Sequence, residues 1–246
     1  MSPDEALERL GALGFEEPDA NVLFDHFEAA ERSGRVGHGF GRIEWLETLR
    51  GLHPEARPML VVDESAFERW SGNGALGYLV LEAVVRRQLE RPPRHARLVV
   101  CDDTFPTGML GYWTRRLADG GLVALMTATS PRRLPHPAGG AKLTGTNPLS
   151  IAVPASHGRP VVTDVSMGTF TYGDVLSGRA TEDELVPFGG DHAHKGFALA
   201  VGLQLLVDAL APSGGFGAVL LVARPEGDPV PAFRSLAAGA RLPGDR

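Results

Sequence analysis

Hydrophobic positions in the first 50 residues recur with a helical period. Ser2 and Glu5 form a capping-box pattern, so a first helix is expected to begin beside them. A second helix is predicted from about Pro18 to Ser33, with one buried face formed by Ala20, Leu23, Phe24, Phe27 and Ala30. A third helix follows, and its apolar face consists of Ile43, Leu46 and Leu49.

Further along the chain, short apolar runs alternate with helical patterns. Strands are predicted at 59–62, 96–101, 122–127, 149–153, 160–165 and 216–223. Helices are predicted at 73–89, 108–117 and 195–210. In the last helix we expect a buried face of Phe197, Val201, Leu205 and Leu206. The alternation is typical of a layered α/β domain.

Composition narrows the classes of protein that fit this pattern. The chain has 246 residues, of which 43% are hydrophobic, and a net charge of −6, so nucleic acid is not an expected partner. Its single cysteine, Cys101, follows a valine-rich run and is expected to be a buried thiol. The polar start does not resemble a signal peptide, and no apolar run approaches the ~20 residues of a membrane span. We therefore expect a soluble, cytoplasmic protein without a membrane partner.

Small polar residues gather at the ends of two consecutive strands. Gly145-Thr146-Asn147-Pro148 precedes the strand at 149–153, and Asp164-Val165-Ser166-Met167-Gly168-Thr169 ends the strand at 160–165. Hydroxyl and amide side chains beside glycines suit a close approach between backbone and ligand. The same residues would also serve as ordinary turn formers.

A second candidate site lies in Gly37-His38-Gly39-Phe40-Gly41-Arg42. If a helix begins near His38, then His38 and Arg42 are at i and i+4 and share one face. A guanidinium can hold a carboxylate while an imidazole moves a proton, so the pair suits a carboxylate substrate. A solvent-facing loop with an ordinary surface arginine is the alternative.

The loop from Pro187 to Gly196 contains glycines and enters a helix. The start of such a helix suits an anion, although ordinary turn residues would look the same. Asp191, His192 and His194 are too few and too loosely spaced to predict a metal site. The sequence lacks a GxGxxG motif after a strand, a phosphate-binding GxxxxGK[ST] motif and a GxSxG motif.

Five motifs in order resemble the malate/L-lactate dehydrogenase family of the second type. They are GHG-x-x-R at 37–42, GTNP at 145–148, D-x-SM through YG at 164–173, P-x-GG through KG-x-x-L at 187–199, and R-x-PG at 241–244. The resemblance implies an α/β fold like that of L-sulfolactate dehydrogenase, with a mixed sheet, a helical N-terminal part and a non-Rossmann way of binding NAD(P).

The resemblance also implies a function and a set of site residues. Family members are homodimers that reduce a 2-oxo acid or a cyclic imine carboxylate with NADH or NADPH. By this likeness His38 is the proton donor and Arg42 holds the carboxylate. Asp164 is a third catalytic candidate, which would orient a partner or take part in proton transfer; a strand-end capping residue is the alternative. The cofactor contacts would be Thr146, Asn147, Ser166, Met167, Gly168, Thr169, Lys195 and Gly196.

The same likeness suggests three consecutive parts. A helical part at 1–93 carries His38 and Arg42, an α/β part at 94–190 binds cofactor and substrate, and 191–246 completes the core. The tail at 241–244 is short and is not expected to pack much.

Several positions depart from the family pattern. Gly37 replaces a serine, and a family histidine is missing from the stretch 102–108, which contains Asp102, Asp103 and Pro106. An acid there would favour a cationic group on the substrate. The chain is also shorter than its relatives between Gly173 and Pro187 and after Phe216. Besides an active reductase, the sequence is therefore compatible with a scaffold that lost hydride transfer and catalyses a non-redox step, or only binds a ligand.

Overall fold

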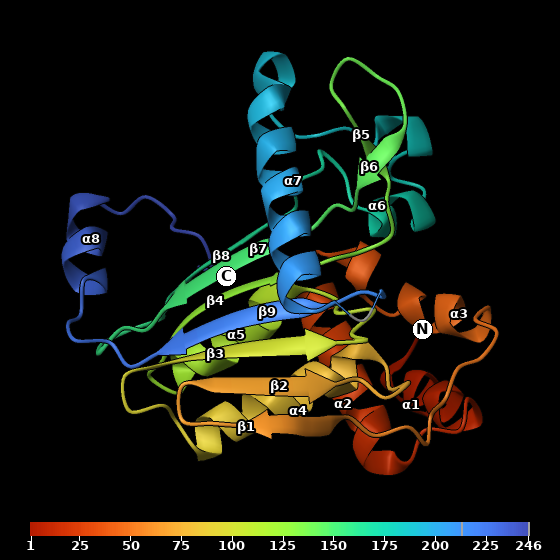
Figure 1. Cartoon of the computed structure of the whole chain (residues 1–246), viewed down its shortest axis with the longest axis horizontal. Coiled ribbons are helices and arrows are strands. Elements are labelled where there is room, and N and C mark those ends of the chain that lie inside the picture. Colours follow the sequence, from red (N-terminus) through yellow and green to blue (C-terminus); the bar gives the residue numbers. More distant parts are fainter. Residues whose placement is uncertain (213, 246) are drawn as a thin grey trace.

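The computed structural model describes residues 1–212 and 214–245, and a seven-stranded mixed sheet forms its centre (Figure 1). The strands are β1 (Met59–Asp63), β2 (Phe67–Ser71), β3 (Ala96–Asp102), β4 (Val123–Ala128), β7 (Leu149–Val153), β8 (Val161–Val165) and β9 (Ala218–Ala223). Their order is β1-β2-β3-β9-β4-β7-β8. Only β2 and β3 pair in parallel, and the other neighbours are antiparallel. A separate ribbon pairs β5 (Leu134–Pro135) with β6 (Lys142–Thr144).

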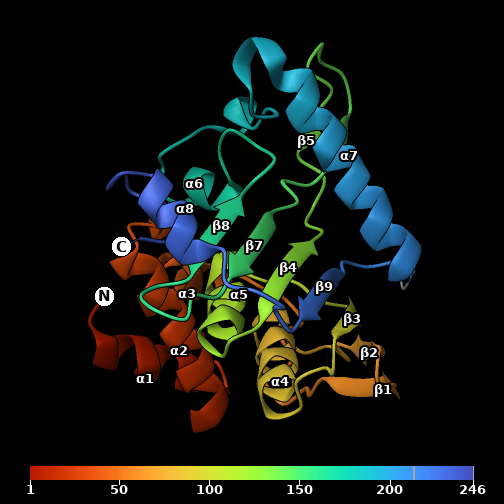
Figure 2. The same cartoon turned by 90° about the vertical axis from the view of Figure 1, so that its left-hand side faces the viewer.

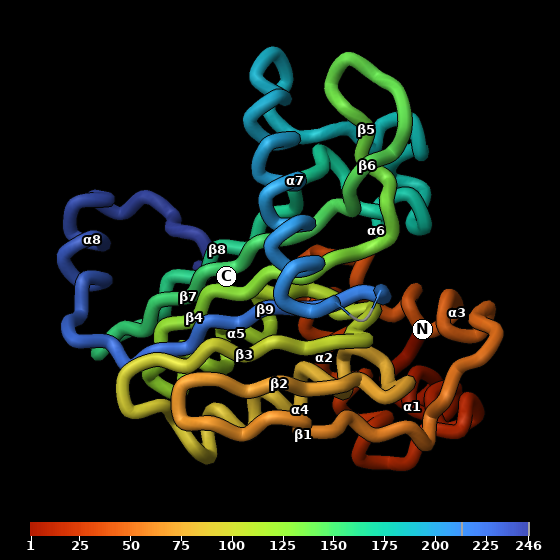
Figure 3. Tube along the Cα trace, viewed as in Figure 1, coloured from red at the N-terminus to blue at the C-terminus, as the bar shows by residue number. Residues whose placement is uncertain are grey.

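The helices form two groups around this sheet. They are α1 (Pro3–Ala12), α2 (Glu17–Arg32), α3 (Gly41–Glu47), α4 (Gly77–Glu90), α5 (Leu110–Asp119), α6 (Tyr172–Leu176), α7 (Ala193–Leu210) and α8 (Val230–Leu236). Short 3₁₀ turns are η1 (Val36–His38), η2 (Glu182–Glu184) and η3 (Gly190–His192). The chain path in Figure 3 shows α1 to α5 gathered on one side of the sheet, whereas α7 rises from the other side.

Alternating side chains of the strands bury both faces of the sheet, as the period of two requires. On one face, Val99 of β3 and Leu220 of β9 join the large core with α2, α4 and α5. On the other face, Val100 and Val219 pack against Val207 of α7. Cys101 is buried in the larger core as expected, and burial raises the pKa of its thiol.

Most predicted elements are confirmed, and the errors are local. The capping box of Ser2 and Glu5 is present. The pattern missed β2, the β5–β6 ribbon and α8. Helix α4 begins at Gly77 rather than at Asn73, because Asn73 and Gly74 have positive φ angles of 51° and 82° and form a turn.

The predicted buried face of α7 is wrong. Its buried residues are Gly196, Ala200 and Val207, whereas Leu205 is 61% exposed and Leu206 is 43% exposed. The helix contacts the sheet through Val207 and Leu210, whereas Leu199, Leu205 and Leu206 are exposed. It projects beyond the strands in Figure 2. A prediction of the buried face that relies on the largest apolar residues therefore selects Leu205 and Leu206, which are exposed.

The same helix changes one expectation about membranes. Among the described residues, the segment 190–210 is the one helix that is long and apolar enough to cross a membrane, with a mean hydropathy of 1.2 in a window that is 17% buried. This finding differs from the expectation, drawn from the sequence, that no apolar run approaches the length of a membrane span. Length and composition are weak evidence, because single apolar helices of soluble proteins pass the same test.

The C-terminal tail also packs more than expected. Leu242 is buried, and the Val162 amide donates to the carbonyl of Pro243 across 3.1 Å. Arg115 donates to the carbonyl of Gly244 across 2.7 Å. The edge strand β8 supplies free backbone groups at this position, so the tail continues the hydrogen bonding of the sheet.

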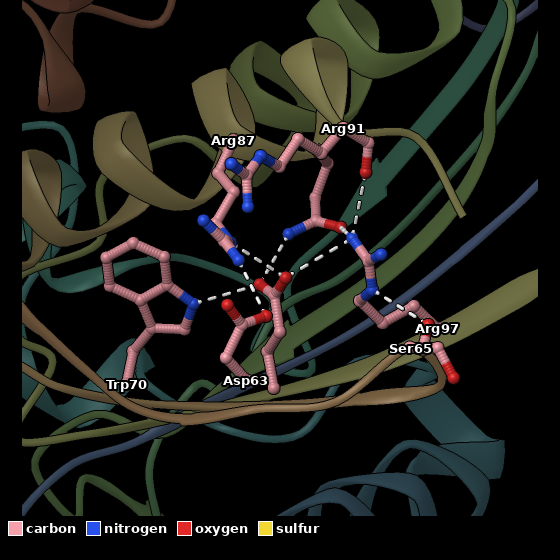
Figure 4. Close-up of polar contacts among 8 residues, drawn as sticks. Asp63, Ser65, Trp70, Arg87, Arg91 and Arg97 are labelled. Atoms are coloured by element: carbon pink, nitrogen blue, oxygen red, sulfur yellow. Dashed lines mark hydrogen bonds and ion pairs between the residues drawn. The ribbon is translucent and has the colours of Figure 1, made fainter.

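A buried ion-pair network fixes β2 to α4 (Figure 4). The Glu68 carboxylate is fully buried and accepts from Arg87 Nε at 2.9 Å, Gln88 Nε2 at 2.7 Å and the Trp70 indole at 3.1 Å. Arg97 lies 3.2 Å from the same carboxylate. The partners come from β2, β3 and α4, so the network fixes the relative position of the two strands and the helix.

Candidate active site

A cavity of about 220 Å³ lies where the N-terminal helices meet the ends of the central strands. Its walls come from η1 and α3, from the loop at 105–110, from the strand ends at 129–133 and 146–148, and from 164–173. Segments that are far apart in the sequence, including the two clusters predicted as candidate sites, therefore converge on one cavity.

His38 and Arg42 both line this cavity, although not as two positions of one helix. His38 ends the η1 turn, Gly39 is extended, and α3 begins only at Gly41, so the predicted helix start near His38 is wrong. The Arg42 Nε donates to the carbonyl of Gly37 at 2.8 Å, and its guanidinium lies 5.4 Å from the centre of the Trp45 ring. These contacts hold the guanidinium in place and leave its two terminal nitrogens available to a ligand.

The imidazole of His38 is neutral in this environment. Burial, together with the nearby cations Arg42, Arg35 and Arg179, lowers its pKa to about 3. Its Nδ1 atom is buried and has no hydrogen-bond partner among the described residues. The positive charges that depress this pKa would be offset by an anionic ligand bound at Arg42, which would raise it.

Gly37 has a packing reason to be glycine. A Cβ atom on Gly37 would lie 2.6 Å from the carbonyl carbon of Gly173, and a Cβ on Gly173 would lie 2.2 Å from the Gly37 oxygen. The backbones of η1 and α6 thus touch at two glycines. A serine at position 37 would require this contact to open.

Asp164 lines the cavity and also supports α5. Its Oδ2 accepts from the Gly111 amide at 2.9 Å in the first turn of that helix. Burial raises the pKa of the carboxyl group, while the Gly111 hydrogen bond and the Arg35 charge act against this rise. The hydrogen bond to Gly111 supports the alternative of a structural capping residue. The position of Asp164 on the cavity wall is also compatible with a catalytic role.

The predicted cofactor residues separate into two sets. Thr146 and Ser166 line the cavity, whereas Asn147, Met167, Gly168 and Thr169 do not. Asn147 is buried and donates to Gln204 of α7 at 2.9 Å, and Met167 packs with Leu134 and Leu185. These two side chains attach the strand ends to α7 and to the neighbouring loops.

The predicted residues Lys195 and Gly196 lie outside this cavity. Lys195 is exposed, and Gly196 lies where a Cβ atom would come within 2.4 Å of the Phe188 carbonyl oxygen. Gly196 therefore packs the start of α7 against the preceding loop. Within one chain, Lys195 and Gly196 therefore do not line the cavity that contains His38.

Asp102 and Asp103 do not replace the missing histidine. Asp102 pairs with Arg69 at 2.9 Å, and Asp103 accepts from the Gly74 amide at 2.9 Å. Neither carboxylate lines the cavity. The expectation that an acid here favours a cationic group on the substrate is therefore wrong. The end of β3 directs both carboxylates away from the cavity, and residues 105–110 line it instead.

Arg35, Tyr78 and Arg133 are among the residues of the cavity wall that sequence reasoning missed. Arg35 precedes His38 by one turn, so its proximity could have been inferred. Arg133 lies in a loop that follows the end of β4. Arg132 and Arg133 are adjacent in this Pro/Gly-rich loop, and this pair could have indicated an anion-binding residue. Tyr78 follows the helical pattern of α4, and nothing in the sequence distinguishes it from a core residue.

A larger groove of about 990 Å³ adjoins the cavity and shares Arg35, Met109 and Asp164 with it. Its other walls come from the end of α2, from α5, from β8 and from the C-terminal tail. Five arginines line it: Arg32, Arg35, Arg115, Arg159 and Arg241. This concentration of guanidinium groups suits a ligand that carries phosphates.

No group of three metal-binding side chains occurs in the parts of the chain that the structure describes. The ring centres of His192 and His194 are 6.0 Å apart, and both residues are exposed.

A second buried histidine lies behind the cavity and makes the fold sensitive to acid. His26 Nε2 accepts from the Met109 amide at 3.0 Å, and its ring packs on Tyr78 and Trp113. Burial, together with the nearby His38 and Arg42, lowers the pKa of His26 to about 3. The low pKa keeps both histidines neutral in the folded protein.

We expect the free energy of unfolding to fall as the pH drops below ~6.5, the ordinary pKa of histidine in an unfolded chain. Between that value and the folded pKa of about 3, the unfolded chain binds more protons. Each histidine then removes up to ~1.4 kcal/mol per pH unit. Urea unfolding at a series of pH values measures this slope. Stability that is unchanged or greater at mildly acidic pH would contradict it.

Comparison with known proteins places this site in a family. The model of the malate/L-lactate dehydrogenase family matches residues 4–185. The L-lactate dehydrogenase of Cupriavidus necator is 28% identical, over 79% of this chain and 65% of its own length. The 2,3-diketo-L-gulonate reductase of Citrobacter koseri is 28% identical, over 76% of this chain and 57% of its own. The chain thus spans about three fifths of the curated relatives it matches.

A solved structure supports the fold independently. The delta1-piperideine-2-carboxylate reductase of Pseudomonas syringae superposes with a TM-score of 0.82, covering 99% of this chain and 89% of the other at 23% identity. At that identity the likeness speaks for the fold alone, and it confirms the expected α/β architecture. Since the family model covers most of the chain and the fold agrees, the chain belongs to the malate/L-lactate dehydrogenase family.

Proposed function

We propose that the protein is an NAD(P)H-dependent reductase that acts on a small 2-oxo acid or a cyclic imine carboxylate. The observation that carries the proposal is the pairing of His38 and Arg42 on one cavity wall, next to an arginine-lined groove. Dehydrogenases and reductases are the named activities of the relatives.

In this proposal Arg42 holds the substrate carboxylate. Its Nε is already occupied by the Gly37 carbonyl, and the Trp45 ring covers one side of the guanidinium. The two terminal nitrogens can then form parallel hydrogen bonds with both carboxylate oxygens, which fixes the direction of the adjacent carbonyl or imine group.

His38 supplies the proton to the reacting oxygen or nitrogen. Carboxylate binding offsets the charge of Arg42, so it raises the low pKa of the imidazole and allows a proton to be held next to the substrate. Protonation of His38 is thereby linked to binding of the substrate carboxylate at Arg42. Asp164, whose carboxyl pKa is raised by burial, lies on the same wall as a third catalytic candidate.

The residues present fit a nicotinamide dinucleotide. The groove has the volume and the guanidinium groups for a diphosphate, and it opens into the cavity at Arg35, Met109 and Asp164. Thr146 and Ser166 are positioned to contact the ring end. When bound, the cofactor supplies the hydride. Either NADH or NADPH is compatible with these contacts.

Isothermal titration of the full chain with NADPH and with NADH tests the cofactor assignment. We expect saturable binding of at least one of them, weakened by high salt because the phosphates are held by arginines. An absence of heat with both cofactors at high protein concentration would remove the reductase from consideration.

A scaffold without hydride transfer is the second candidate. The position of Lys195 and Gly196 outside the cavity, and that of Asn147 and Met167 in packing roles, favours it. Such a protein would use the Arg42 pocket for a cyclisation, isomerisation or elimination, or only to bind a ligand. Turnover that needs no nicotinamide distinguishes this candidate from the reductase.

We also propose that the protein forms a homodimer through α7. Leu199, Leu205 and Leu206 are 49%, 61% and 43% exposed on this projecting helix. An apolar face of this kind is costly to leave in water, and a second copy would bury it. A cytoplasmic location and the division at residues 93 and 190 remain predictions.

Replacing Leu205 with glutamate is expected to convert the dimer to a monomer, because a charge would enter the apolar interface. Light scattering during gel filtration measures the mass. Glu226→Ala, at a polar turn away from α7, is the control and should leave the mass unchanged. A wild-type mass equal to one chain, or a dimer that persists in the Leu205 variant, would overturn this assignment.

A further inference from the structure

Two side chains on the cavity wall keep a buried polar atom without a hydrogen-bond partner in the part of the chain that the structure describes. One is His38, through its Nδ1 atom, and the proposed function uses it. The other is Tyr78, whose side chain is fully buried and whose hydroxyl group contacts no donor or acceptor. A buried hydroxyl that forms no hydrogen bond destabilises a fold, so its presence beside a cavity points to a ligand.

Packing fixes the ring of Tyr78. Its centre lies 4.9 Å from that of the His26 ring and 5.3 Å from that of the Phe27 ring, and both contacts are edge-on. A Cβ atom on Gly108 would lie 2.4 Å from Cε1 of the tyrosine, so the backbone of the neighbouring loop also touches the ring. The ring is therefore held in one position by contacts that do not involve its hydroxyl group.

The start of α4 places this ring at the cavity. Gly77 donates its amide to the carbonyl of Phe105 at 3.2 Å, and a Cβ atom at position 77 would lie 2.6 Å from the carbonyl oxygen of Pro106. The first turn of the helix therefore packs directly against the loop at 105–110. That loop lines the cavity without an ionisable side chain, so the phenol of Tyr78 is the ionisable group at this part of the wall.

The hydroxyl group of Tyr78 stays protonated at neutral pH. Burial raises the pKa of the phenol above its ordinary value of ~10, while the charge of Arg42 acts against the rise. Tyr78 is therefore a hydrogen-bond donor throughout the neutral pH range. Because Arg42 shares the cavity wall and is close enough to affect the phenol, a carboxylate bound at Arg42 brings its adjacent carbonyl group towards this hydroxyl.

We propose that Tyr78 is a further catalytic residue, which donates a hydrogen bond to the reacting carbonyl oxygen of the substrate beside His38. The inference rests on the proposed function, in which Arg42 holds the adjacent carboxylate. As the hydride reaches the carbonyl carbon, the electron pair of the C=O π bond moves to the oxygen, and this oxygen takes the proton of His38. Tyr78 keeps its own O–H bond and stabilises the negative charge that develops on the oxygen.

This role makes Tyr78 selective for a carbonyl group over a cyclic imine. A carbonyl oxygen has two lone pairs, so it can accept from His38 and from Tyr78 at the same time. An imine nitrogen has one lone pair, which the proton of His38 occupies, and the hydroxyl group then has no acceptor. The two substrate classes that the proposed function leaves open should therefore respond differently when this hydroxyl is removed.

Tyr78→Phe removes the hydroxyl group and keeps the ring. We expect kcat for 2-oxo acids to fall about 10²- to 10³-fold, as when one donor to a developing oxyanion is lost, and kcat for Δ1-piperideine-2-carboxylate to change little. Thr144→Val is the matched control, because it removes another buried, unpartnered hydroxyl from outside the cavity and the groove. Both variants should resist urea at least as well as the wild type, since neither loses a hydrogen bond.

Binding of matched acids tests the contact without turnover. 2-Oxobutanoate and butanoate differ by the oxygen that Tyr78 would bind. Isothermal titration, with and without NAD⁺ or NADP⁺, should show that Tyr78→Phe weakens 2-oxobutanoate about 3- to 10-fold, the range of a neutral hydrogen bond, and does not weaken butanoate. Unchanged affinity for 2-oxobutanoate would overturn the inference. An equal loss for both acids would also overturn it, by assigning the hydroxyl to the carboxylate.

Other outcomes separate this inference from the proposed function. If Tyr78→Phe selectively weakens 2-oxobutanoate and no NAD(P)H oxidation occurs with any substrate, the hydroxyl contact is supported and the reductase is removed. Reduction of 2-oxo acids by Tyr78→Phe at the wild-type rate supports the reductase and overturns the inference. A wild-type protein that reduces the cyclic imine and no 2-oxo acid overturns the inference as well.

Discussion

Replacement of His38 with glutamine is expected to lower kcat by about 10²- to 10⁴-fold, the usual contribution of a positioned general acid. Glutamine retains a similar size and polarity but cannot transfer a proton at neutral pH. Because His38 lies on the cavity wall rather than in the arginine groove, the Kd for NADH or NADPH should change little. Steady-state rates and titration of the cofactor measure the two quantities.

The exposed histidine His53 provides a matched control for that variant. It pairs with Glu55 at the surface, 3.3 Å away, and it is absent from both cavities. His53→Gln should keep the wild-type rate. Full turnover by His38→Gln would show that another group supplies the proton, and a loss of cofactor binding in that variant would assign His38 to the cofactor site instead.

The rate of reduction should also depend on pH in a defined direction. An acid catalyst must be protonated, so turnover falls as the pH rises above the pKa of His38 in the substrate complex. In the free protein that pKa is lowered to about 3. A bound carboxylate raises it, and the change in the pH profile between free and substrate-bound protein reports this linkage.

Removal of the Glu68 carboxylate is expected to have the largest effect on stability. Glu68→Ala should lower the free energy of unfolding by about 3–5 kcal/mol, because breaking one side of a buried ion pair leaves uncompensated charge. Arg87 and Arg97 both lie within ion-pair distance of this fully buried group. Chemical denaturation measures the change, and Glu68→Gln should lose less because it keeps the hydrogen bonds to its side-chain oxygen.

An exposed glutamate on α4, the helix that the Glu68 network contacts, serves as the control. Glu90 is in the last turn of α4 and approaches only Arg86, at 3.9 Å, with both side chains largely exposed. Its replacement by alanine should not change stability measurably, since exposed pairs contribute little. A Glu68→Ala variant as stable as the Glu90→Ala variant would show that the network does not hold β2 to α4.

The elements that were predicted correctly are those whose hydrophobic periodicity matches the face that the fold buries. The face of α2 and the strands β3, β4, β7 and β8 follow their hydrophobic periods, since the sheet and its covering helices bury them. The buried face of α7 was assigned wrongly because its fully buried residues are Gly196, Ala200 and Val207, whereas the predicted Leu205 and Leu206 are exposed. Which side of an apolar helix is covered depends on partners that periodicity does not reveal.

The site was predictable in part for a similar reason. His38, Arg42, Asp164, Thr146 and Ser166 were found by motif, and the structure brings them to one cavity. The direction of Asp102 and Asp103 depends on ion pairing and on a turn with positive φ at Asp103, which the sequence did not indicate. The place of Arg133 on the cavity wall involves its stack with Tyr172, a contact between residues nearly forty positions apart.

Transfer of deuterium from a labelled cofactor tests the central claim most directly. The chain would be incubated with NADPH or NADH carrying deuterium on the transferring face, together with a panel of 2-oxo acids and Δ1-piperideine-2-carboxylate. Mass spectrometry then locates the label in the product. We predict deuterium at the former carbonyl or imine carbon, with transfer greatly reduced in His38→Gln. Product that forms without label, or equally well without nicotinamide, would contradict hydride transfer in this cavity.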